Sequence, residues 1–229
     1  KAFLEREFAD YASQSPYEEI KSPFRPNKTA NEKIMTPDKQ NAFTFGVQGV
    51  QISEYAEDYP ALEIATTILG GGILNSRITE RLRQKDGVSY GAGGNLQADP
   101  DKDDQNSQIF VYAIYNPGNL EKVQLGFREE IQRFIDEGVT EEEVKNAVNG
   151  WVQGQNVSRA KDNELSSLIN NNLYYNRDMS YHKQMEERVS KLTVAEVNAA
   201  IRKYVKPFDR WTVVSAGDYK ETPAPSGQE

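Results

Sequence analysis

The sequence contains no cysteine and only one histidine, His182, among its 229 residues. The absence of cysteine excludes disulfide bonds, thiolate metal ligands and a cysteine nucleophile. A zinc site usually recruits two or more histidines or acidic residues at fixed spacing, and neither H-E-x-x-H nor H-x-x-E-H occurs. Glu186 follows His182 by four residues, so the second histidine of either motif is missing. We therefore expect no metal site in this chain and interpret His182 as an ordinary residue of a surface helix.

Basic residues are also fewer than acidic residues. The chain has 27 Lys and Arg against 35 Asp and Glu, a formal net charge of −8. Nucleic acids and anionic membranes attract basic surfaces, so this balance argues against both as general partners. No apolar run approaches the roughly 20 residues of a membrane span. The composition predicts a polar globular protein that is long enough to bury a core.

The distribution of proline and charge predicts three parts. Residues 1–37 are predicted to be a linker segment, because SPYEEIKSPFRPNKTA has the prolines and scattered charge of an extended connector. Residues 38–218 are predicted to form the main domain. Residues 219–229, which include ETPAPSGQE, are predicted to be a flexible tail. The chain begins at Lys1 without a signal peptide, and we interpret it as a fragment of a longer protein.

Hydrophobic periodicity predicts the elements of the main domain. In NAFTFGVQGV, Phe43, Phe45 and Val47 alternate with Thr44 and Gln48, which predicts a strand with one buried face. Apolar residues at 3–4 spacing predict helices, and the sequences TEEE and TVAE form capping boxes. The predicted order is a strand over 41–50, helices over 59–70 and 75–87, strands over 89–98 and 107–115, helices over 120–138, 140–152, 162–173, 180–190 and 193–204, and a strand over 210–217.

This order predicts the fold class. Strands and helices are partly segregated, which favours an α+β fold with a mostly antiparallel sheet and helices packed on one face. The other face of the sheet would then need a partner or would line a cavity.

The stretch RLRQKDGVSYGAGG, residues 81–94, places Arg83 and Tyr90 on either side of a turn. Arg83 lies about 100° around the helix from Leu82 and so points away from the apolar stripe. Arginine offers fixed donors to carbonyl or carboxylate groups, and tyrosine offers a hydroxyl that can reach a developing oxyanion. The alternative is structural: arginine near a helix C-terminus is favoured by the helix dipole, and a tyrosine at a strand start usually packs.

Glycines interrupt the same region. Gly91, Gly93 and Gly94 indicate either a close approach of another backbone or a ligand, or a bulge in the strand. The run at 70–72 is not followed by lysine, so we interpret it as a joint between helices and not as a phosphate-binding loop.

The sequence LGGGILNSRITERLRQKDGVSYGAGG, residues 69–94, resembles the C-terminal, non-metal-binding domains of the pitrilysin/insulinase family of inverted-zincin metallopeptidases. The glycine run, NSR, LRQKDG and SYG match in order and spacing. The element order from Asn41 to Ala216 also fits that domain. In detail the chain looks most like the last domain of the long bacterial members, which are built of four homologous domains.

The resemblance implies a metalloprotease-like domain of the LuxS or processing-peptidase type and two catalytic residues. Tyr90 would hydrogen-bond the scissile carbonyl and its tetrahedral intermediate, and Arg83 would orient the peptide. Arg83, Tyr90 and Gly91 would contact the substrate, and the glycine-rich strand would leave room for an extended chain. Zinc would be held by a homologous partner domain or subunit, so this chain alone would be inactive.

Two other functions stay open at this point. The chain could be a catalytically silent scaffold of the same fold, or a module that binds peptides without cleaving them. Retention of both Arg83 and Tyr90 favours the peptidase half. The resemblance also implies a periplasmic or other bacterial envelope location.

Overall fold

The computed structural model of the chain describes residues 1–15, 17–72 and 76–219. Its centre is a five-stranded sheet with the strand order β1-β5-β2-β4-β3. β1 runs parallel to β5, and the other neighbours are antiparallel, which confirms the predicted sheet type. The strands are β1 (Ala30–Met35), β2 (Ala42–Gln51), β3 (Ser89–Gln97), β4 (Asn106–Tyr115) and β5 (Thr212–Gly217).

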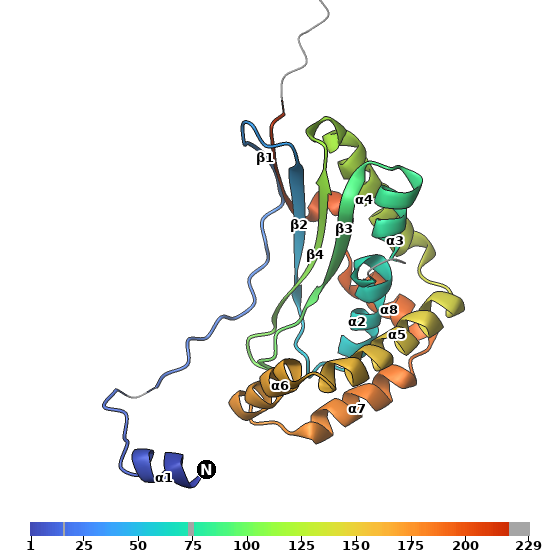
Figure 1. The fold of residues 1–229 in the computed structure, drawn as a ribbon. Helices are drawn as coiled ribbons and strands as arrows, with labels where there is room; N and C mark the ends of the chain where they lie inside the picture. The colour runs from blue at the N-terminus through green and yellow to red at the C-terminus, as the bar shows by residue number, and fades with distance from the viewer. Residues whose placement is uncertain (16, 73–75, 220–229) are drawn as a thin grey trace, which may run out of the picture.

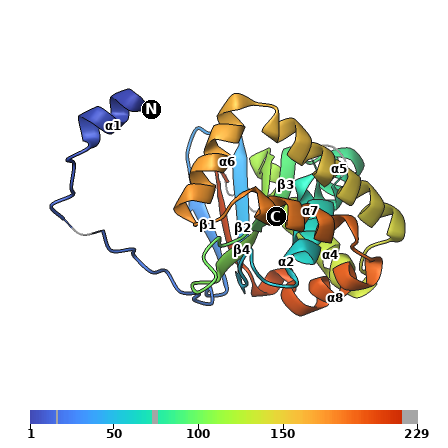
Figure 2. The same ribbon diagram turned by 90° about the horizontal axis from the view of Figure 1, so that it is seen from below.

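Helices cover one face of this sheet, as Figures 1 and 2 show. Two of them change their winding, since α2 (Tyr59–Thr66) continues as the π-helical η1 (Thr67–Gly71), and α3 (Arg77–Thr79) continues as the π-helical η2 (Glu80–Lys85). The longer helices are α4 (Leu120–Glu137), α5 (Glu141–Arg159), α6 (Asp162–Tyr174), α7 (Met179–Ser190) and α8 (Val194–Tyr204). The short ones are α1 (Ala2–Phe8), η3 (Pro117–Asn119) and η4 (Phe208–Arg210).

The core lies between the sheet and these helices. On α4, four residues at the predicted 3–4 spacing, Val123, Phe127, Ile131 and Phe134, are fully buried. The Phe127 ring lies 5.5 Å from the ring of Phe208. Phe208 in turn lies 5.8 Å from the ring of Trp211, which leads into β5. Both predicted capping boxes form, with Thr140 capping α5 and Thr193 capping α8. The starts of α5 and α8 therefore follow directly from local sequence, whereas α5 runs to Arg159, seven residues beyond the predicted end.

In β2 the predicted alternation is present, but the polar side packs on the helices. Thr44 and Gln48 are buried, whereas Phe43 on the opposite face is 42% exposed. The reason is hydrogen bonding: Thr44 Oγ1 lies 2.6 Å from Tyr115 Oη, and Gln48 bonds to the backbone of Tyr204 and Lys206. A buried polar group is tolerated when it is paired in this way. The aromatic side chains are consequently left on the uncovered face of the sheet.

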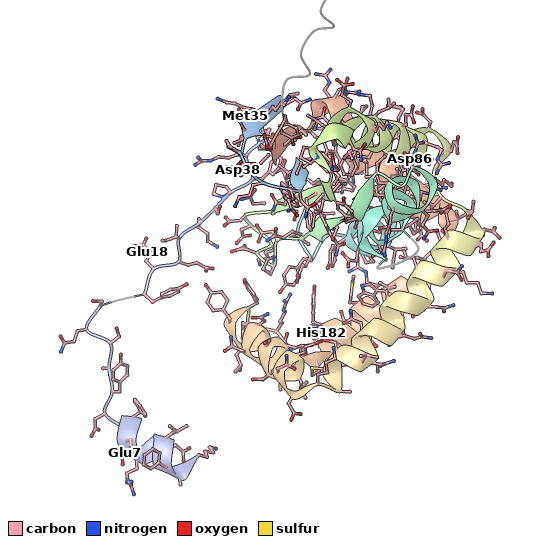
Figure 3. All side chains as sticks on the ribbon, turned by 45° about the horizontal axis from the view of Figure 1, so that its top comes forward. Glu7, Glu18, Met35, Asp38, Asp86 and His182 are labelled. Atoms are coloured by element: carbon pink, nitrogen blue, oxygen red, sulfur yellow. The ribbon has the colours of Figure 1, made fainter. Side chains whose placement is uncertain are left out.

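The linker segment contains a strand that the sequence pattern does not predict. β1 has a polar sequence, ANEKIM, and is exposed along most of its length. It is fixed by pairing with β5, from Ala30 opposite Thr212 to Met35 opposite Gly217. Further upstream, Glu7 in α1 and Glu18 lie apart from the sheet in Figure 3, whereas Asn27, just before β1, bonds to Val47 and Gly49 of β2 and to Thr212 of β5.

His182 lies in α7, as predicted, and is half-buried. Its Nε2 lies 2.8 Å from Asn172 Oδ1 of α6, and burial lowers the pKa of its imidazole. Within residues 1–15, 17–72 and 76–219, no group of three His, Cys, Asp or Glu side chains could hold a metal ion.

Candidate functional site

A closed loop connects the helix that carries Arg83 to the strand that carries Tyr90. The backbone N–H of Val88 donates to the carbonyl of Leu82 at 2.9 Å, and the N–H of Asp86 donates to the carbonyl of Arg81 at 2.9 Å. Gly87 adopts a φ of +62°, which residues with a side chain rarely take. The chain therefore reverses within a few residues, so that Arg83 and Tyr90 flank one short loop.

Arg83 is the free member of a series of three arginines. Arg77 donates to both oxygens of Glu143 at 2.7 and 2.8 Å, and Arg81 donates to Asp86 and to Glu129. Arg83 is exposed and makes no hydrogen bond or ion pair within the part of the chain that the structure describes. Leu82 beside it is 1% exposed, so the predicted division between the apolar stripe and Arg83 is confirmed. The guanidinium of Arg83 is thus available to a ligand.

Tyr90 lies in a β-bulge. Ser89 pairs with Tyr115 and Gly91 pairs with Ile114, so Tyr90 has no opposite residue on β4. A bulge of this kind redirects one side chain away from the regular alternation. Ser89 Oγ lies 2.9 Å from the carbonyl oxygen of Gly91 and 2.8 Å from that of Ile114, which fixes the bulge. The Tyr90 side chain is 65% exposed, and its hydroxyl makes no hydrogen bond to any described residue.

A cavity of about 220 Å³ lies beside the loop. Arg83 and Gly91 both line it, so the structure brings these two predicted site residues together. Tyr90 is not among the lining residues, although it directly precedes Gly91. Tyr112 lines the same cavity and was not predicted as a site residue. The remaining lining residues are Gly70, Gly71, Gly72, Thr79 and Ala92.

The glycines of β3 divide between the two predicted explanations. A Cβ on Gly70 would lie 2.4 Å from the backbone nitrogen of Gly94, so these two glycines allow η1 to pack against the strand. A Cβ on Gly91 would meet nothing within 4 Å, which leaves open space next to Arg83 and Tyr90. Gly94 is therefore explained by packing inside the domain, and Gly91 by the cavity or the bulge.

The outer edge of β3 is closed by the domain itself. The hydroxyl of Thr79 donates to the carbonyl of Ala92 at 2.8 Å, and the N–H of Leu96 donates to the Asn95 side chain at 2.9 Å. With η1 packed at Gly94, this edge has little backbone left for a further strand.

Aromatic rings line the uncovered face of the sheet. Phe43 lies 6.4 Å from Phe45 and 6.2 Å from Tyr112, and Phe45 lies 5.6 Å from Phe110. Because Tyr112 also lines the cavity, this face is continuous with the space beside Arg83. The alternation of residues 43–47 could have revealed it, since the apolar residues of that strand need not face the core.

These features define an α+β domain with an uncovered aromatic sheet face, a free arginine and tyrosine beside a cavity, and no metal-binding cluster among its described residues. The family model for the peptidase M16 inactive domain matches residues 1–150, and the chain belongs to this family.

Individual relatives agree with this assignment. The chain is 28% identical, over 145 residues, to SCO5738 of Streptomyces coelicolor, an uncharacterized zinc protease; the match covers 62% of this chain and 30% of that protein. A peptidase M16 inactive domain from Pseudomonas fluorescens has a TM-score of 0.70 and 23% identity over 88% of this chain and 46% of that chain. The periplasmic protease PqqL from Escherichia coli has a TM-score of 0.71 and 17% identity over 94% of this chain and 23% of that chain. The chain thus spans less than half the length of each of these three proteins.

The comparisons confirm the predicted family and fold. They do not test the roles of Arg83, Tyr90 and Gly91, which stay predictions. Among the helices that the structure describes, none is long and apolar enough to cross a membrane.

Proposed function

We propose that this chain is the non-metal-binding part of a zinc metallopeptidase, and that Tyr90 and Arg83 act on a peptide bound at a zinc site of a homologous partner domain. The observation that carries the proposal is the state of these two side chains. Both are exposed donors without an internal partner in the described structure, and Arg83 borders a cavity that also contains Gly91.

The chemistry assigned to this chain is binding and charge stabilisation. The Tyr90 hydroxyl would donate to the oxygen of the scissile carbonyl as negative charge develops there. Arg83 would donate to a backbone carbonyl or carboxylate of the peptide and hold it in register. The described residues offer no group of three ligands for a zinc ion, and in this proposal the metal is held by the partner domain.

The uncovered sheet face supports a role in binding an extended peptide. Phe43, Phe45, Phe110 and Tyr112 form a ring-stacked surface that an enclosed chamber would shield from water. An extended peptide between two such halves would lie along this surface, with the free space at Gly91 next to the reacting carbonyl. The closed edge of β3 means that contact is made by side chains and not by an added strand.

The test is peptide cleavage by this chain combined with its zinc-bearing half. We expect Tyr90→Phe to lower kcat by ~10²–10³, the usual effect of removing one oxyanion donor. Arg83→Ala is expected to raise KM and lower kcat/KM. Tyr11→Phe and Arg128→Ala remove an exposed hydroxyl and an exposed guanidinium elsewhere and should leave both constants unchanged. Cleavage at parental rates by both site variants would overturn the proposed roles and favour a silent scaffold.

We also propose a bacterial envelope location. PqqL, which shares the fold, is described as a periplasmic protease. Fractionation of the native host followed by detection of the protein tests this, and recovery from the cytoplasm alone would contradict it.

A further inference from the structure

A second cavity, of about 590 Å³, lies between α2 with η1, β3 and α5. Gly71 and Gly72 line both this cavity and the one that contains Arg83. The two spaces therefore adjoin across the glycine run. A peptide held at Arg83 and Gly91 would have its neighbouring residues within reach of the larger cavity.

The larger cavity contains one carboxylate without a cation. Glu63 and Glu143 are its charged lining residues, and no Lys, Arg or His lines it. Glu143 is already bound at 2.7 and 2.8 Å by Arg77. Glu63 makes no ion pair within the described residues. Burial raises the pKa of its carboxyl to about 7, and a hydrogen bond from the indole of Trp151 opposes part of that rise.

Glu63 also borders a smaller cavity of about 160 Å³. None of the ionisable side chains that line this cavity forms an ion pair with Glu63. Arg177 lines that space but is bound by Glu54 at 2.5 Å. The pKa of His182 is lowered, so this imidazole is neutral at pH 7. The ionisable residues lining this cavity besides Glu63 are Glu54, Tyr59, Arg177, Tyr181, His182 and Glu186. Burial raises the pKa of Tyr59 and of Tyr181, and Glu186 is bound by Arg159.

The remaining walls suit a peptide. A Cβ on Gly150 or Gly154 would meet nothing within 4 Å, so the backbone of α5 is bare along this side. Asn146 and Gln155 line the cavity and make no hydrogen bond to other described residues. Their amides can pair with the N–H and C=O groups of a bound chain. Trp151 adds an indole, the aromatic group that attracts cations most strongly.

We propose that this cavity is a subsite for a lysine or arginine side chain of the bound peptide, with Glu63 as its counter-ion and Trp151 beside it. The inference rests on the proposed function, because the peptide is the one that Arg83 and Tyr90 hold. A half-buried carboxylate that has one hydrogen bond, from Trp151, but no cation is costly to keep charged, and a cationic side chain lowers that cost by pairing with it. An acidic side chain would place a second negative charge beside Glu63 and is excluded.

Binding can be measured on this chain alone, with the peptide Ac-Ala-Ala-Lys-Ala-Ala-NH₂ and analogues that carry norleucine or glutamate in place of lysine. Trp151 fluorescence reports occupancy, since the only other tryptophan, Trp211, is 1% exposed in the core. We expect the lysine peptide to bind at least tenfold more tightly than the norleucine peptide at pH 8, and the glutamate peptide to bind most weakly. The preference for lysine should shrink as pH falls through about 7, where Glu63 takes up a proton.

Two variants decide the origin of the preference. Glu63→Gln keeps the shape and should remove both the preference for lysine and its pH dependence. Glu142→Gln removes an exposed carboxylate from the same helix as Trp151 and should change neither. Equal binding of the lysine and norleucine peptides by the parent, or a lysine preference that survives in Glu63→Gln, would overturn the inference. Calorimetry on Trp151→Phe should show weaker binding of the lysine peptide. An unchanged affinity would show that the indole does not contact the lysine side chain.

The two proposals fail separately. The binding test needs no zinc-bearing half, so a negative result leaves the cleavage test of Tyr90→Phe untouched. Conversely, normal cleavage by Tyr90→Phe would refute the catalytic role even if the lysine preference were found.

Discussion

Replacing Gly70 by alanine should destabilise the domain, although alanine is normally the better residue in a helix. Gly70 lies in η1, and a Cβ at this position would lie 2.4 Å from the nitrogen, 2.7 Å from the Cα and 2.9 Å from the oxygen of Gly94. All three contacts are with backbone, so no side chain can rotate away. β3 or η1 must move, and overpacking of this kind typically costs about 1–3 kcal/mol.

The neighbouring glycine provides a matched control. A Cβ on Gly71 would lie 3.4 Å from Asn95 Oδ1 and 3.6 Å from Thr67 Oγ1, which are ordinary contacts. Gly71→Ala should therefore be neutral or stabilising by up to about 1 kcal/mol. Urea unfolding would measure the free energy of unfolding of each variant, provided that the m-value is unchanged. For a chain of this size, each kcal/mol corresponds to a shift of about 2–4 °C in Tm. If the two variants proved equally stable, the close packing of η1 on β3 would be refuted.

Two further substitutions test the helix connections. Burial alone would raise the pKa of Glu143, but the hydrogen bonds from Arg77 and Thr140 bring this pKa below the ordinary 4.5. The charged carboxylate therefore stabilises the fold above pH 4.5. This contribution is lost as pH falls through the lowered pKa of the folded state. Arg77→Met should then cost about 2 kcal/mol at pH 7 and clearly less at pH 3 in urea unfolding, whereas an equal cost at both values would contradict the pairing. Thr193→Ala removes the cap of α8 and should lower stability by about 1 kcal/mol; thermal unfolding that matches the parent would show that the capping box contributes nothing.

The sequence was most informative where one local rule acts alone. The capping boxes at Thr140 and Thr193 and the stripe of α4 depend on a few neighbouring residues, and the structure has them as predicted. The turn at Gly87 likewise follows from local sequence, and it delivers Arg83 and Tyr90 to the same region.

The remainder depends on distant partners. β1 is a strand only because β5 lies beside it, and its polar sequence gives no sign of that pairing. The buried face of β2 is set by Tyr115 and the backbone at Tyr204, which bond its polar side chains. Glu63 had a local signal that could have been used, since it is the only charged residue in YPALEIATTILG. The cavity around it arises from α5, some 80 positions further on, and could not be read from that segment.

The position of β5 has a consequence for how the protein is made. β5 is inserted between β1 and β2, yet it is synthesised last of the five strands, and the partners Ala30 and Thr212 are 182 positions apart. While the ribosome is still producing the helices, the aromatic strand β2 can pair with β4 on one side only. Its other edge stays unsatisfied until Thr212–Gly217 emerges, a situation that invites association between nascent chains. Chaperones that bind nascent chains would therefore be needed at the β5-facing edge of β2 more than at β3.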